Sequence, residues 1–108
     1  MSEEAIELLR KLDFKELNSD CSKNNLNLRI DDHTKEKFQA ALRTAYLLIT
    51  QPIDIAIPRE TKMDSMQSIR EVKKVLDSLY LKTKDQKYKN NINHINDLMG
   101  NGKLRWMR

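Results

Sequence analysis

The chain has 108 residues, of which 39% are apolar and 33% charged, with two glycines and two prolines. This length and composition predict a mainly α-helical single small domain of about four helices, with room for one core. The longest apolar run, at residues 45–49, is much shorter than the ~20 residues that cross a bilayer, so no membrane contact is expected. The lone Cys21 cannot form an internal disulfide, so we expect a reducing, cytoplasmic setting.

Charge is sorted along the sequence. Residues 1–20 carry a net charge of −3 and residues 61–108 a net charge of +6, within a total of +4. A chain that gathers its cations toward one end produces a directed positive field, and polyanions are the usual partners of such a field.

The first half of the sequence predicts two helices. A short helix over residues 2–12 places three apolar side chains on one stripe, those of Ile6, Leu9 and Leu12. A polar loop is expected over 18–25, and strict alternation predicts a short extended, strand-like segment at about 26–30. Asp31 or Asp32 then caps a helix that runs to about residue 49.

The second half predicts another extended segment and two more helices. Pro52 and Pro58 bracket alternating isoleucines at about 53–57, which favours an edge strand. A capping box at Asp64 predicts a helix over 65–82, and Asp85 caps a last helix that Gly100 ends in a left-handed conformation. We divide the chain into a helical domain, 1–102, and a basic C-terminal tail, 103–108. The three long apolar stripes should converge on one core: Phe38, Leu42, Ala45, Leu48, Ile69, Val72, Leu76, Leu79, Ile92 and Ile95.

The C-terminal quarter is the strongest candidate binding surface, because its lysines and arginines face few acids. Lysine and arginine neutralise phosphates, asparagine hydrogen-bonds base edges, and tryptophan offers a stacking plane. The candidate nucleic-acid-binding residues are Lys84, Lys87, Lys89, Asn90, Asn93, Lys103, Arg105, Trp106 and Arg108. The alternative is an ordinary solvated helix face, with Trp106 folded back into the core.

The stretch LNLRIDDHTKEKF, residues 26–38, resembles the opening of a ribbon-helix-helix DNA-binding protein. The resemblance implies a strand that pairs across a dimer and enters the major groove, with Asn27 and Arg29 at base edges. The sequence departs from that family downstream, because the apolar rhythm of the next helix continues to Ile49 and prolines follow.

No catalytic, cofactor or metal motif is recognisable. Cys21, His33 and the nearby Asp31 and Asp32 lack the closely spaced ligand pairs of zinc sites. No glycine-rich phosphate loop is possible, since the two glycines are Gly100 and Gly102. We therefore expect neither an enzyme nor a bound cofactor or metal.

Two functions remain open. The first is a non-enzymatic regulatory or accessory protein, of the kind that phages and plasmids encode, which binds DNA or RNA through its basic C-terminal region. The second is an adaptor or inhibitor whose basic end meets an acidic surface on a partner protein. Three features favour this second function: the acidic first helix, the isoleucine-rich segment, and the apolar side chains of the tail. A homodimer is compatible with both.

Overall fold

The computed structural model describes residues 2–51 and 55–108 of the chain. Over these residues it contains α1 (Ser2–Arg10), α2 (Phe14–Lys23), α3 (Asp32–Thr50), α4 (Arg59–Thr83), α5 (Gln86–Met99) and the 3₁₀ helix η1 (Gly102–Met107). No strand occurs among them. The prediction of a mainly α-helical small domain is confirmed.

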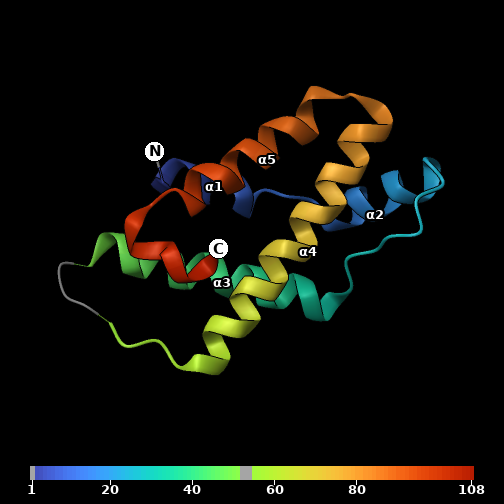
Figure 1. Cartoon of the computed structure of the whole chain (residues 1–108). Coiled ribbons are helices and arrows are strands. Elements are labelled where there is room, and N and C mark those ends of the chain that lie inside the picture. Colours follow the sequence, from blue (N-terminus) through green and yellow to red (C-terminus); the bar gives the residue numbers. More distant parts are fainter. Residues whose placement is uncertain (1, 52–54) are drawn as a thin grey trace.

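Helix α4 is the longest of the described helices and crosses the molecule obliquely (Figure 1). Its 25 residues extend about 38 Å, at 1.5 Å per residue, in a molecule whose longest dimension is 45 Å. α3 and α5 both pack on α4, and α1 packs on α3 and α5. α5 doubles back from the end of α4, so these two helices form an antiparallel hairpin with a long shared surface.

The core is a single cluster to which every helix contributes. The predicted core residues are buried, apart from Leu48, which is partly buried against the cluster. The structure adds Ile6 and Leu9 from α1 and, from η1, Leu104 and Met107, which are 0% and 1% exposed. The basic tail is therefore also a core element, because η1 packs on α3, α4 and α5.

Helix α2 replaces most of the polar loop that the sequence predicted for residues 18–25. The Asp13 carboxylate caps it by accepting from the Glu16 backbone N–H at 3.1 Å. Phe14, Leu17 and Cys21 follow at helical spacing and are all buried. The loop was predicted because the Asn, Ser and Asp residues of this stretch favour turns, but burial of the three apolar side chains outweighs that preference.

Two predicted helix ends also differ from the structure. α4 begins at Arg59, directly after Pro58, rather than at Asp64, because proline's fixed φ suits a helix start. Gly100 ends α5 in the right-handed region, at φ −74°, rather than in the left-handed one. A left-handed residue instead ends α4: Lys84 has φ 59° and ψ 17°. Asn25, after α2, also has a positive φ, of 58°.

The predicted extended segments form no strands among the described residues. Residues 26–30 are irregular, although Asn27 and Arg29 are exposed and Ile30 is buried, as alternation predicted. The Asn18 side chain binds both backbone groups of Ile30, each at 2.8 Å, and so takes the place of a neighbouring strand. In the second segment, residues 53 and 54 lie outside the described residues, and residues 55–57 have no regular structure.

Candidate nucleic-acid interface

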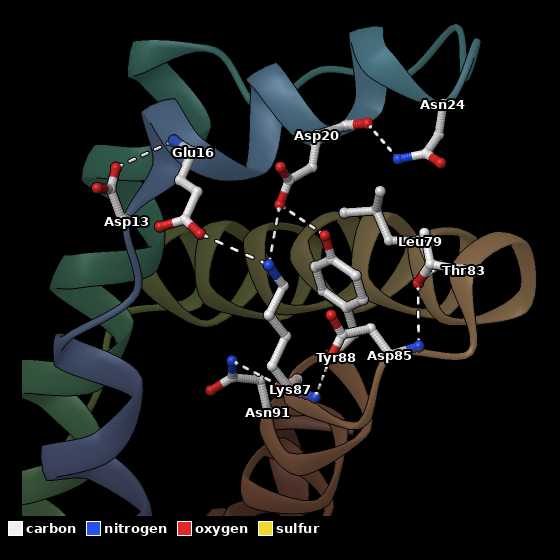
Figure 2. Close-up of polar contacts among 10 residues, drawn as sticks. All are labelled: Asp13, Glu16, Asp20, Asn24, Leu79, Thr83, Asp85, Lys87, Tyr88 and Asn91. Carbon is white, nitrogen blue, oxygen red and sulfur yellow. Dashed lines mark hydrogen bonds and ion pairs between the residues drawn. The ribbon is translucent and has the colours of Figure 1, made fainter.

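The start of α5 meets α2 in a polar cluster (Figure 2). The Tyr88 hydroxyl donates to Asp20 Oδ2 at 2.6 Å. Lys87 Nζ lies 3.7 Å from Glu16 Oε1 and 3.8 Å from Asp20 Oδ2. Lys87 thus points to the acids of α2, and its charge is compensated within the molecule.

Burial of Tyr88 raises the pKa of its hydroxyl well above the usual range, and the hydrogen bond to Asp20 raises it further. The hydroxyl therefore stays protonated and acts as a donor. A groove of about 260 Å³ borders this cluster, and its walls include Asp13, Glu16, Lys87 and His94. Because opposite charges already pair inside the cluster, it serves to hold α2 on α5 rather than to bind a polyanion.

A different surface gathers uncompensated cations at the turn between α4 and α5. Lys84 Nζ lies 5.6 Å from the centre of the Tyr80 ring, and Lys89 Nζ lies 5.7 Å from it. Both contacts are within the range of cation–π attraction. Tyr80 thus brings together two lysines, one from the end of α4 and one from α5.

A second group of cations borders a groove between α4, α5 and η1. The groove has a volume of about 300 Å³, and apolar side chains, including Ile69 and Ile95, form part of its lining. Arg70, Lys73 and Arg108 also line it. Arg70 donates to the Arg108 carbonyl at 3.2 Å, and Arg108 Nε donates to the Met99 carbonyl at 2.9 Å. These hydrogen bonds fix two arginines beside the groove.

Helical spacing joins the two groups into one surface, here called the α4–α5 face. On α4, successive steps of three or four residues connect Arg70 to Lys84, and on α5 they connect Lys89 to Asn96. Its members are Arg70, Lys73, Asp77, Tyr80, Lys84, Lys89, Asn93, Asn96 and Arg108. These residues include five cations and one side-chain carboxylate, and the exposed Asp97, four residues after Asn93, lies at the edge of the face.

The structure divides the residues that the sequence selected. Lys84, Lys89, Asn93 and Arg108 lie on the α4–α5 face. Lys87 faces α2, and the exposed Asn90 accepts a hydrogen bond from Gln86 at 3.1 Å. The remaining three belong to η1: Lys103 and Arg105 are exposed, and Trp106 is partly buried with Lys62 Nζ 5.8 Å from its ring centre.

Sequence reasoning missed Arg70, Lys73 and Asn96. The signal for them lies in the antiparallel pairing of α4 with α5 about the turn at residues 84–85. In such a hairpin, Tyr80 opposes Lys89, and the same register brings Lys73 to Asn96 in the groove. To find these residues, one must know which residues of α4 and α5 lie opposite each other. That depends on how the apolar side chains of the two helices pack together.

The part of the chain that resembled a ribbon-helix-helix protein does not form that arrangement. Residues 26–30 are no strand, and Asn18 occupies both backbone groups of Ile30 that would pair across a dimer. α3 has 19 residues, and the next helix begins only at Arg59. Asn27 and Arg29 are exposed but lie outside the α4–α5 face.

Comparisons of the chain with protein-family models, with curated proteins and with solved structures find no match. Within residues 2–51 and 55–108, no helix is both long and apolar enough to cross a membrane. Cys21 is fully buried, and the same residues contain no group of three or more His, Cys, Asp or Glu side chains placed to hold a metal ion.

Proposed function

We propose that the protein is a non-enzymatic accessory protein that binds nucleic acid through the α4–α5 face. The observation that carries the proposal is the excess of five cations over one carboxylate on a surface built by two adjacent helices. Phosphate contacts by lysine and arginine supply most of the affinity in sequence-independent binding. The amides of Asn93 and Asn96 add hydrogen-bonding groups between the cations.

A salt series tests this proposal. Labelled DNA and RNA oligonucleotides are titrated with the protein at increasing salt, and the affinity should fall steeply, with a slope of about 0.7 to 0.9 per phosphate contact. Replacing Lys84 and Lys89 together by Gln should reduce that slope by almost two. The matched control is Lys15→Gln with Lys23→Gln, which removes two exposed lysines of α2. Absence of binding at low salt, or equal effects of the two pairs, would contradict the proposal.

Exposed apolar side chains favour protein binding as a second candidate function. Leu47, near the end of α3, is 48% exposed, and Met63, near the start of α4, is 56% exposed. The buried Leu104 and Met107 are no longer available as interface residues, so this candidate depends on the α3 and α4 ends. A partner captured from nuclease-treated lysate should be lost with Leu47→Glu and Met63→Glu and kept with Lys84→Gln and Lys89→Gln.

A further inference from the structure

The cations of the α4–α5 face form two separate groups. Lys84 and Lys89 lie at the turn between the helices, and Arg70, Lys73 and Arg108 lie beside the groove near η1. Lys73 and Lys84 are about 16 Å apart along the axis of α4, at 1.5 Å per residue. The surface between the groups carries Asp77 and Asn93, so it has hydrogen-bonding groups and no cation, whereas Asn96 lies beside the groove with Arg70 and Lys73.

The face lacks an open stacking surface for unpaired bases. All six aromatic residues belong to the described part of the chain, and Tyr80 is the one on this face. Its ring already has two lysine ammonium groups within 6 Å. Proteins that hold single strands rely on aromatic stacking worth about 1–3 kcal/mol per base. The face is therefore poorly suited to a single strand.

The backbone at Lys84 is a further feature of the turn. It occupies the left-handed region, at φ 59°, where glycine is the usual residue at a helix end. A lysine there is less stable than glycine in the same conformation. The Lys84 ammonium group lies at the end of the α4–α5 face that is nearest the turn between the two helices.

From these features we infer that the ligand of the α4–α5 face is double-stranded DNA; this inference rests on the proposed function. The two cation groups, about 16 Å apart, contact phosphates of the two strands that border the major groove. This groove is about 12 Å wide in B-DNA and admits one helix, so the helix pair lies across the groove rather than inside it. Asn93 lies over the groove between them, Asn96 lies with Arg70 and Lys73, and Asp77 is a like charge near the phosphates. The major groove of duplex RNA is deep and narrow, so its two edges lie too close together to match the spacing of the two cation groups.

The decisive experiment compares three labelled ligands with the full chain at one salt concentration. These are a 20-base-pair DNA duplex, one of its strands alone, and an RNA duplex of the same sequence. We expect the DNA duplex to bind at least about tenfold more tightly than either of the others. Equal or tighter binding of the single strand or the RNA duplex would overturn this inference while leaving the proposed function intact. Failure of all three to bind would overturn both.

Paired substitutions test the two-group arrangement. Arg70→Gln with Lys73→Gln, and Lys84→Gln with Lys89→Gln, should each lower the salt slope for the DNA duplex by about 1.8, at roughly 0.9 per contact. Asn93→Ala with Asn96→Ala should weaken binding at least threefold and leave the slope unchanged. Asn91→Ala, on the side of α5 that borders the groove beside α2, is its control and should change neither. If only one of these two cation pairs changes the salt slope, the two-group arrangement is wrong.

Discussion

Lys84 combines an unfavourable backbone conformation with a place on the proposed DNA-binding face. Lys84→Gly relieves the left-handed strain, so the free energy of unfolding should equal or exceed that of the natural chain by up to about 1 kcal/mol. The same change removes one phosphate contact, so the salt slope of DNA binding should fall by about 0.9. Urea unfolding and a salt series measure the two effects.

Lys82→Gly is the control for this prediction, because Lys82 is exposed inside α4. Glycine inside a helix should lower the free energy of unfolding by about 1 kcal/mol. If Lys84→Gly is destabilising to the same extent, the left-handed conformation of Lys84 is wrong.

Tyr88 stabilises the junction of α2 and α5 through its protonated hydroxyl. Its pKa is raised by burial and by Asp20, so the folded chain keeps a proton that the unfolded chain releases above about pH 10. This contribution to stability is complete below pH 10 and declines as the pH rises further. Tyr88→Phe should therefore lower the free energy of unfolding at pH 8 by about 1–2 kcal/mol, by loss of the hydrogen bond.

At pH 11 the difference between the natural chain and Tyr88→Phe should become smaller, because the natural chain alone loses the contribution of the hydroxyl. Urea unfolding at both pH values measures this change. Tyr46→Phe, at an exposed tyrosine, should follow the natural chain at both values. A constant difference between Tyr88→Phe and the natural chain would show that the tyrosine hydroxyl titrates normally.

Residue types alone located part of the candidate site. Lys84, Lys89, Asn93 and Arg108 could be chosen from the sequence because they belong to a quarter of the chain with few acids. The sequence could not show that Lys87 faces Glu16 and Asp20, since this pairing joins α5 to a helix that had been predicted mostly as loop. Local charge balance therefore identifies candidates, and tertiary packing decides which of them remain uncompensated.

The sequence left open whether residues 103–108 fold back into the core or project, and η1 folds back. Leu104 is fully buried, while its neighbour Lys103 is exposed. Leu104→Ala should lower the free energy of unfolding by about 2–5 kcal/mol through lost burial and a cavity. Lys103→Ala should change it by less than about 0.5 kcal/mol. Denaturant unfolding followed by Trp106 fluorescence gives both values, and a loss below 1 kcal/mol at Leu104 would show that η1 is loosely attached.

Helices with a long apolar rhythm were predictable from the sequence, and the short or irregular elements were not. α3 and α5 begin where Asp31 and Asp85 cap them, as expected. α2 has ten residues and depends on burial of Phe14 against Phe38, with the ring centres 5.8 Å apart. Such an element is stabilised by contacts with distant parts of the chain, so its local sequence indicates it only weakly.

At the scale of the whole molecule, folding reduces the charge separation seen along the sequence. The acids of α2 meet Lys87 at the start of α5, so one flank of α5 is nearly balanced. The opposite flank joins α4 and keeps its cations. The α4–α5 face therefore keeps an excess of positive charge, to which Arg108 of the C-terminal tail contributes.

Asp77 is the carboxylate within that face, so its charge opposes the field directly. Asp77→Asn should raise the affinity for a DNA duplex by about two- to fivefold near 0.05 M salt, because a like charge close to the phosphates is removed. The gain should shrink toward 0.5 M salt, because the Debye length there is only about half its value of 8 Å at 0.15 M. Glu36→Gln on α3, which packs on another side of α4, is the matched control and should change the affinity by less than about 1.5-fold. Equal gains from both variants would mean that net charge alone governs binding and that the α4–α5 face has no special part in it.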